Sequence, residues 1–325
     1  RVAVRGDRTV LQAMLEAARP HCLRILGPNC LGLLVPGIGL NASFAHASAQ
    51  DGPIAFVSQS GALCTVVLDW ARAEGIGFSH FIALGNAADV DFGDIIDYLA
   101  SDRRTSAILL YIESIRQARK FLSAARAAAR NKPIIAVKAG RSQAAARAAW
   151  SHTGALAGSD EVFTAALNRA GIVRVESAEE MFEAATTLAR IGRTQSERLT
   201  ILTNGGGPGI IAVDALAAVG GDLAELAPQT LAALDRVLPD TWSRANPVDI
   251  IGDAPSGRYA DALRILGRDP NADAILVLHA PTAVVPALDV AQGVIAAAPS
   301  LTGKKLLTCW LGRGAVAASR QAFVA

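Results

Sequence analysis

A histidine set among small side chains is the residue of this 325-residue sequence that is best suited to chemistry. His152 stands in the stretch Ser151-His152-Thr153-Gly154, where a ligand can reach it from several directions. An imidazole is a competent nucleophile near neutral pH, and its charge state is easily tuned there. The pattern predicts a histidine that carries a phosphoryl group. A surface or capping histidine is the alternative.

A phosphohistidine needs hydrogen-bond donors for its oxygens, and two glycine-containing turns after apolar strands can supply them. Each turn leads into a predicted helix, whose free backbone N–H groups and positive dipole end favour anions. We therefore expect phosphate to bind at two helix N-termini, through Ser60, Gly61, Gly205, Gly206, Gly207 and Gly209. Ordinary tight strand-to-helix connections use the same residue types, and this is the alternative for each turn taken alone.

Two charged residues, Glu113 and Lys138, each end a predicted buried strand. The carboxyl ends of parallel strands meet at one edge, where open α/β sheets build their sites. Glu113 could accept a hydrogen bond from one imidazole nitrogen and leave the other free to attack phosphorus. Lys138 could meet a phosphate or a carboxylate. The alternatives are an acid near a helix N-terminus for Glu113 and a solvated lysine for Lys138.

The composition argues against several classes of partner. The chain is 51% hydrophobic and 18% charged, and its net charge is only +2, so we expect neither a nucleic-acid partner nor a charged membrane surface. No apolar run approaches the roughly 20 residues of a membrane span. The cysteines have no metal-binding spacing, so we expect no metal site in this chain, free thiols and a cytoplasmic location. They are Cys22, Cys30, Cys64 and Cys309.

Short apolar strands alternate with helices along the chain, in two series. The first series has strands at 54–57, 78–84, 107–112 and 133–137, with helices at 62–73, 115–129 and 161–170. The second has strands at 199–202, 274–278 and 305–310, with helices at 209–219, 284–297 and from 315 onward. This alternation predicts βαβ units and parallel sheets covered on both faces. We expect two doubly wound α/β domains, residues 52–192 and 197–325.

The first 45 residues are too few to bury a core of their own. They contain a predicted helix at 9–18 and a short strand at 23–26, and they are expected to be the C-terminal part of a further α/β domain. Because Arg1 is not a natural start, we expect the chain to be cut from a longer one. Motifs for a nucleophile elbow, a P-loop and a dinucleotide-binding Gly-x-Gly-x-x-Gly turn are absent from the sequence.

Five motifs together resemble the NDP-forming acyl-CoA synthetases, relatives of succinyl-CoA synthetase, and most of all the ADP-forming acetyl-CoA synthetases. They are Gly27-Pro28-Asn29-Cys30-Leu31-Gly32, Val57-Ser58-Gln59-Ser60-Gly61, Tyr111-Ile112-Glu113-Ser114, Ser151-His152-Thr153-Gly154 and Asn204-Gly205-Gly206-Gly207-Pro208-Gly209. The resemblance implies two flavodoxin-like parallel-sheet domains after the C-terminal remnant of a Rossmann-like CoA-binding domain. The stretch Asn246-Pro247-Val248-Asp249 also matches the family, without an assigned role.

The resemblance further implies an activity: acyl-CoA, ADP and phosphate exchange with carboxylate, CoA and ATP through phospho-His152, with Glu113 as its partner. Acetate or another short acid is the expected substrate. Residues near the thiol end of CoA and the acyl group would be Asn29, Cys30, Gly85 and Asn86. The nucleotide and Mg²⁺ are expected on an ATP-grasp domain that this chain lacks, in cis or on another subunit of an oligomer.

Some further strings resemble one bacterial subgroup, in which a synthetase-like region precedes a GNAT-type lysine acetyltransferase. They are Leu84-Gly85-Asn86, Ala88-Asp89-Val90-Asp91-Phe92-Gly93-Asp94 and Thr241-Trp242-Ser243-Arg244-Ala245-Asn246-Pro247. In some of these fusions the synthetase half has lost its histidine and senses acyl-CoA. The alternative function is therefore a non-catalytic regulatory module, although His152 is retained here.

Overall fold

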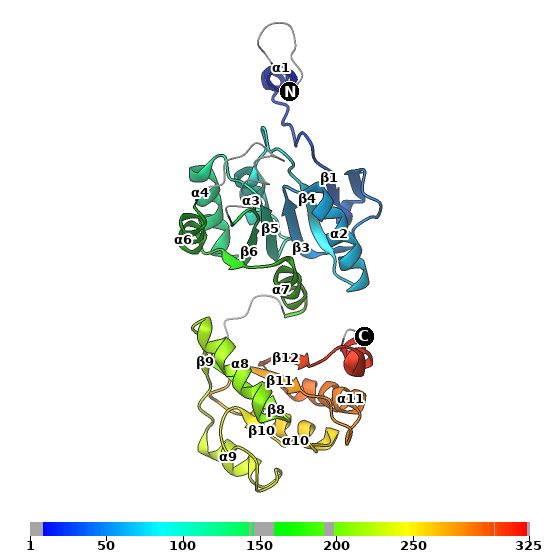
Figure 1. Ribbon diagram of the computed structural model, residues 1–325, viewed down its shortest axis with the longest axis vertical. Coiled ribbons are helices and arrows are strands. Elements are labelled where there is room, and N and C mark those ends of the chain that lie inside the picture. The colour runs from blue at the N-terminus through cyan, green and yellow to red at the C-terminus, as the bar shows by residue number, and fades with distance from the viewer. Residues whose placement is uncertain (1–8, 143–144, 146–158, 192–197, 302, 324–325) are drawn as a thin grey trace. The chain divides into compact units, whose positions relative to one another are not determined.

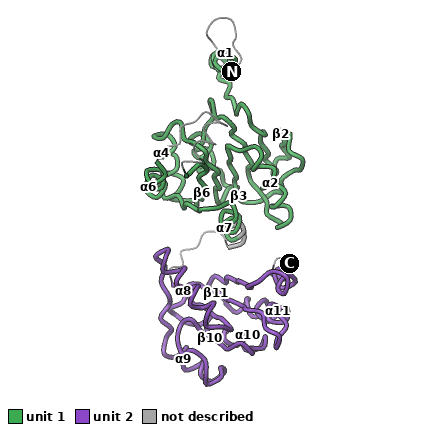
Figure 2. Tube along the Cα trace, in the orientation of Figure 1, with its two compact units in different colours: residues 1–193 green, residues 194–325 purple. Residues whose placement is uncertain are grey.

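The chain forms two compact units, residues 1–193 and 194–325 (Figure 2). The computed structural model describes residues 9–142, 145, 159–191, 198–301 and 303–323. His152 lies outside the described residues. Each unit is described by itself below.

Unit 1 is built on a seven-stranded sheet with the order β2-β1-β4-β3-β5-β6-β7 (Figure 1). Neighbouring strands from β4 to β7 are parallel, whereas β1 runs antiparallel to both β2 and β4. The strands are β1 (Gly32–Val35), β2 (Leu40–Ser43), β3 (Asp51–Ser58), β4 (Phe78–Ala83), β5 (Ala107–Ile112), β6 (Ile134–Lys138) and β7 (Val173–Val175).

Helices cover both faces of this sheet because alternate strand residues are apolar on each side. In β3, Ile54 and Phe56 join one core with α2 and α7, while Ala55 and Val57 join the other with α3, α4 and α6 (Figure 1). The helices are α1 (Val10–Ala18), α2 (Gly61–Ala73), α3 (Phe92–Ser101), α4 (Ala118–Ala129), α6 (Asp160–Ala170) and α7 (Ala178–Ile191). The doubly wound, flavodoxin-like parallel sheet predicted from the sequence is confirmed.

The N-terminal segment differs from its prediction. Residues 23–26 form no strand, because their backbone bonds go to the loop after β4: the Ile25 N–H donates to Asp89 Oδ2 at 2.7 Å, and the Val90 N–H donates to the Ile25 carbonyl at 3.2 Å. The hairpin of β1 and β2 was not predicted. It adds to the edge of the unit 1 sheet through β4.

Unit 2 has a smaller sheet, in which β10, β8, β11 and β12 are neighbours in that order and β9 also pairs with β8. All of these pairs are parallel. The strands are β8 (Arg198–Thr203), β9 (Asp222–Leu223), β10 (Val248–Asp249), β11 (Ala274–His279) and β12 (Lys305–Trp310). The helices are α8 (Gly206–Ala218), α9 (Pro228–Leu234), α10 (Ser256–Leu266), α11 (Ala287–Ala297) and α12 (Ala317–Ala322).

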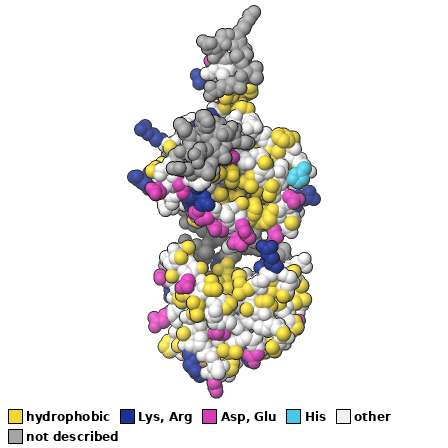
Figure 3. Space-filling view, in the orientation of Figure 1, with side chains coloured by type: hydrophobic (Ala, Val, Ile, Leu, Met, Phe, Trp, Pro, Cys, Tyr) yellow, Lys and Arg dark blue, Asp and Glu magenta, His cyan; other side chains and the backbone are white. Residues whose placement is uncertain are grey.

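Helix α8 is apolar but scarcely buried. Gly209 is its one buried residue, and Ile210 and Ile211 are 64% and 71% exposed. The unit 2 core instead joins the sheet to α9, α10 and α11. Apolar side chains are spread widely over the face of unit 2 drawn in Figure 3.

Gly85 fixes the N-terminal segment against the end of β4. It has a φ of +54°, and a methyl group there would lie 2.5 Å from the Pro28 carbonyl oxygen and closer still to that of Asn29. Only glycine permits this approach of two backbones.

We predict that Gly85→Ala destabilises unit 1 by about 1–3 kcal/mol more than Gly75→Ala. Gly75 is the matched control because its φ is +66° but nothing lies within 4 Å of an added methyl. Gly75→Ala should therefore cost only the left-handed backbone strain, about 1–2 kcal/mol. Urea unfolding followed by circular dichroism measures both. Equal losses for the two variants would contradict the prediction.

Candidate functional site

The carboxyl ends of β3, β4, β5 and β6 meet at one edge of the unit 1 sheet. This edge carries the turn after Ser58, the loop after Ala83, Glu113 after β5 and Lys138 at the end of β6. Since the strands are parallel, Ser60, Gly61, Glu113 and Lys138 collect where α/β sheets place their sites, whereas His152 lies outside the described residues.

The turn from β3 into α2 is closed by its own hydroxyl groups. The Ser60 N–H donates to Ser58 Oγ at 3.0 Å, and that hydroxyl donates to the Ser60 carbonyl at 3.0 Å. Ser60 Oγ caps the helix by accepting from the Leu63 N–H at 3.3 Å. The N–H groups of Gly61 and Ala62 are left with no acceptor among the described residues, so these two can donate to an anion.

Buried polar side chains on either side hold the Glu113 backbone. Gln59 Oε1 accepts from the Glu113 N–H at 2.7 Å and from the Ser114 N–H at 2.9 Å. Lys138 Nζ donates to the Glu113 carbonyl at 2.9 Å. Gln59 and Lys138 are only 9% and 7% exposed. Glu113 itself is half-buried, so its carboxylate stands on a fixed backbone at the sheet edge.

The predicted CoA-binding and acyl-binding residues also lie together. The Asn86 N–H donates to the Pro28 carbonyl at 2.9 Å, and Asn29 Nδ2 donates to Asn86 Oδ1 at 3.4 Å. The Cys30 thiol is half-buried, with Sγ 3.7 Å from the Leu26 carbonyl. The next residue packs on the start of α2, because a methyl group on Gly61 would lie 3.8 Å from the Leu31 nitrogen. This cluster therefore borders the helix N-terminus described above.

Unit 2 has a turn of the same chemistry after β8. The Gly205 N–H donates to Thr203 Oγ1, and Thr203 Oγ1 donates to the Gly205 carbonyl, both at 3.1 Å. Asn204 makes two hydrogen bonds to Ala280, the residue after β11. Asn204 Nδ2 donates to the Ala280 carbonyl at 2.9 Å, and Asn204 Oδ1 accepts from the Ala280 N–H at 2.8 Å. Gly205 supplies no side-chain cap to α8.

The two turns share one pattern that the sequence analysis missed. Ser58-Gln59-Ser60-Gly61 and Thr203-Asn204-Gly205-Gly206 each run hydroxyl, amide, small residue, glycine. In each, the hydroxyl closes the turn and the amide ties it to the neighbouring strand end. Comparing residue chemistry at the two strand ends, instead of residue identity, would have revealed it.

A carboxylate lies beside the start of α8. A methyl group on Gly206 would be 3.3 Å from Asp249 Oδ2, while nothing lies within 4 Å of one on Gly207. Gly209 is closely packed, because a methyl group added to it would lie 3.3 Å from Thr203 Cγ2. The Gly209 N–H donates to the Gly205 carbonyl. Gly206 and Gly207 are exposed in the first turn of α8, and the charge of Asp249 beside Gly206 opposes an anion there.

Asn246, from the unassigned family stretch, ties β8 to the residue that follows β9. Its Nδ2 donates to the carbonyls of Leu199 and Ala224 at 2.8 and 2.9 Å, and its Oδ1 accepts from the Ile201 N–H at 2.9 Å. The Asn246 side chain therefore hydrogen-bonds to the backbone of β8 and of the residue after β9. These bonds fix the chain just before β10 and so position Asp249.

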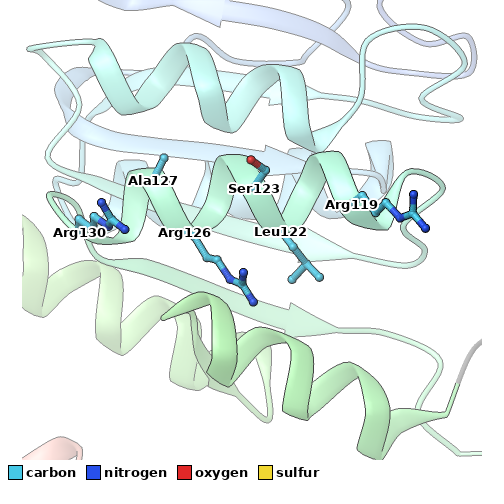
Figure 4. Close-up of a pocket in the computed structure, with 6 residues that line it drawn as sticks. All are labelled: Arg119, Leu122, Ser123, Arg126, Ala127 and Arg130. Atoms are coloured by element: carbon cyan, nitrogen blue, oxygen red, sulfur yellow. The ribbon is translucent and has the colours of Figure 1, made fainter.

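A groove of about 460 Å³ lies on the exposed side of α4 (Figure 4). Its lining includes Arg119, Arg126 and Arg130 but none of the residues at the sheet edge, so it is separate from the candidate site.

In the described ranges, no helix is both long and apolar enough to cross a membrane. The same ranges contain no group of three or more His, Cys, Asp or Glu residues arranged to hold a metal ion.

Known proteins match this chain over nearly all of its length. Residues 51–188 match the succinyl-CoA ligase like flavodoxin domain, and residues 199–305 match the Ligase-CoA domain. The solved structure of a dinucleotide-forming acetyl-coenzyme A synthetase 1 from Ca. Korarchaeum cryptofilum, in complex with phosphate and ADP, superposes with a TM-score of 0.91. It is 34% identical, over 98% of this chain and 69% of that one. The chain belongs to the family of ADP-forming acetyl-CoA synthetases.

Two curated members of this acetyl-CoA synthetase family are longer than the chain. The acetate–CoA ligase [ADP-forming] I of Archaeoglobus fulgidus is 41% identical over 299 residues, which are 92% of this chain and 42% of that protein. The alpha subunit of acetate–CoA ligase [ADP-forming] I of Pyrococcus furiosus is 38% identical, over 89% of this chain and 62% of that subunit. The family predicted from the motifs is confirmed, whereas the resemblance to acetyltransferase fusions stays a prediction.

One buried histidine of this synthetase chain was not predicted. His279 ends β11 and is 1% exposed, and its Nδ1 lies 3.0 Å from the Tyr259 hydroxyl. Burial lowers the pKa of His279, because desolvation disfavours the charged ring. It directly precedes Ala280, the residue that Asn204 holds.

We predict that unit 2 loses stability as the pH falls from 7 to 5. The unfolded chain takes up a proton on His279 near pH 6.5, while burial lowers the pKa of His279 in the folded chain, so each pH unit below this value costs at most about 1.4 kcal/mol. His279→Gln should flatten this dependence. Hydrogen–deuterium exchange of peptides covering β11 reports unit 2 alone. Identical pH slopes for the two proteins would refute the assignment.

Proposed function

We propose that this chain is the CoA-ligase part of an enzyme that interconverts acyl-CoA, ADP and phosphate with carboxylate, CoA and ATP. The observation that supports this proposal most directly is the arrangement of residues at the edge of the unit 1 sheet. There Gln59 ties Glu113 to the turn that carries the free N–H groups of Gly61 and Ala62, and Leu31, which follows Asn29 and Cys30, packs on Gly61. The N–H groups suit an anion, Glu113 suits an imidazole, and the cluster around Asn29 and Asn86 suits the polar end of a thioester.

The connectivity of the chain supports His152 as the phosphoryl carrier. Ala139, just after β6, donates its N–H to the Ile112 carbonyl at 2.9 Å, so the segment that contains His152 starts at this edge. It ends at Ser159, the N-cap of α6, whose Oγ accepts from the Val162 N–H. His152 stands seven positions before that cap, and seven positions span at most about 25 Å, so the imidazole is within reach of the edge.

In the proposed sequence, phosphate displaces CoA from acyl-CoA and forms an acyl phosphate. His152 takes the phosphoryl group and releases the carboxylate, then passes the group to ADP and is regenerated. Glu113 accepts a hydrogen bond from one ring nitrogen, which fixes the tautomer and stabilises the charge on the ring. The N–H groups of Gly61 and Ala62 bind the phosphoryl oxygens. Gly206 and Gly207 are the corresponding donors of unit 2.

The partners are part of the proposal. ATP and Mg²⁺ would bind an ATP-grasp component, in cis or on another subunit, and the name of the Pyrococcus relative as an alpha subunit supports such a division. CoA would place its thiol end near Asn29, Cys30, Gly85 and Asn86, where side-chain amides and a half-buried thiol adjoin. A short carboxylate such as acetate is the proposed acid, which is released in this direction and supplies the acyl group in the reverse direction.

The test is phosphorylation of the full-length protein with its ATP-grasp component, radiolabelled ATP and Mg²⁺. We expect an acid-labile label that is absent from His152→Ala. Glu113→Gln should slow the rate of labelling by roughly 10²-fold, because the ring loses its hydrogen-bond partner. His46→Ala, which removes an exposed histidine of the same unit, should keep the label.

A folded, intact protein that takes no label would contradict the proposal. That outcome would favour the alternative, a regulatory module that binds acyl-CoA without turning it over. Isothermal titration with acetyl-CoA would then distinguish a sensor, which binds, from a chain that has lost both properties.

A further inference from the structure

Lys138 is a buried cation that the proposed reaction leaves without a role. Its side chain is 7% exposed at the end of β6. Nζ donates to the Glu113 carbonyl at 2.9 Å and to the Ala139 carbonyl. A solvated lysine, the alternative drawn from the sequence, does not fit this burial. A buried ammonium needs compensating acceptors, and backbone carbonyls supply them here.

The charge on Lys138 lies within a group of ionisable side chains. Burial lowers the pKa of Lys138, Asp160 and Glu113 act to raise it, and Arg174 acts to lower it further. Arg174 is itself buried and pairs with Asp160, Nη2 to Oδ2, at 2.8 Å. The charge of Lys138 thus interacts with two carboxylates, the one proposed to serve His152 and the one at the first residue of α6.

The same side chain also contacts α6. Nζ lies 5.5 Å from the centre of the Phe163 ring, one turn into that helix. Helix α6 begins where the segment containing His152 ends. Lys138 therefore touches both structures that must be aligned for Glu113 to meet His152.

The backbone of Glu113 is held from both sides. Its N–H is taken by Gln59 Oε1 at 2.7 Å and its carbonyl by Lys138 Nζ at 2.9 Å. With both polar groups engaged, the Glu113 backbone is fixed at the sheet edge, so the point from which its side chain starts is fixed as well.

We infer that Lys138 is a positioning residue that aligns Glu113 with the start of α6, and so with His152. This inference rests on the proposed function. Lys138 touches no reacting atom. It acts through Glu113, and its effect should vanish when Glu113 can no longer serve the imidazole.

The experiment is a double-mutant cycle in the full-length protein with its ATP-grasp component. We expect Lys138→Met to slow single-turnover phosphorylation by about tenfold or more, while the KM for ATP changes less than twofold. In a Glu113→Gln background the same change should cost less than twofold, because residues that act as a unit are not additive.

Lys132→Met is the matched control. Lys132 likewise donates to two backbone carbonyls, those of Leu99, at 2.5 Å, and Asp102, but it precedes β6 and so lies at the opposite edge of the sheet. The Lys132→Met substitution should lower the melting temperature and leave the rate of phosphorylation unchanged. If Lys138→Met does not fold, Lys138→Gln, which keeps an N–H donor, takes its place in the cycle.

Each outcome decides between the two proposals. Wild-type protein that takes no label ends the proposed function and this inference together. Labelled wild-type protein with a Lys138 variant of equal rate overturns this inference alone. A rate loss that persists in full in the Glu113→Gln background also overturns it, because it shows a role that is merely structural.

Discussion

The candidate site depends on how a buried parallel strand ends. At that point the backbone must satisfy its own polar groups and still leave N–H groups of the next helix free for an anion. A hydroxyl on the last strand residue meets both needs, since it accepts from and donates to the residue two positions on. The amide that follows then fixes the turn to the neighbouring strand. Both units use this solution with different residues.

The two units differ in the charge beside this turn. In unit 1 Ser60 caps α2, and polar side chains hold Glu113 at the neighbouring strand end. In unit 2 the cap is a glycine, and Asp249 stands next to the first helical residue. The uncapped helix offers more direct access for an anion, but only against the charge of Asp249. We propose that the N-termini of α2 and α8 are therefore not equivalent as anion sites.

The sheet architecture could be predicted because apolar runs such as residues 107–112 end sharply at polar or glycine residues. The start of α8 could not, because Gly206, Gly207 and Pro208 are poor helix formers and the helix begins there nonetheless. The β1–β2 hairpin was missed since its partner, β4, is distant in the sequence. The places of Gln59, Lys138 and Asn204 at strand ends can be read from the sequence. Their bonds to Glu113 and Ala280 cannot, because only the folded chain brings these strand ends together.

The exposed apolar surface of α8 has a consequence for the charge at its first turn. The field of a helix terminus is weakened by water, which surrounds this helix along most of its length. Any surface that covered Ile210 and Ile211 would exclude that water and lower the local dielectric constant. Anion affinity at Gly206 and Gly207 would then rise together with the area covered, so burial of the helix and occupancy of its terminus are thermodynamically linked.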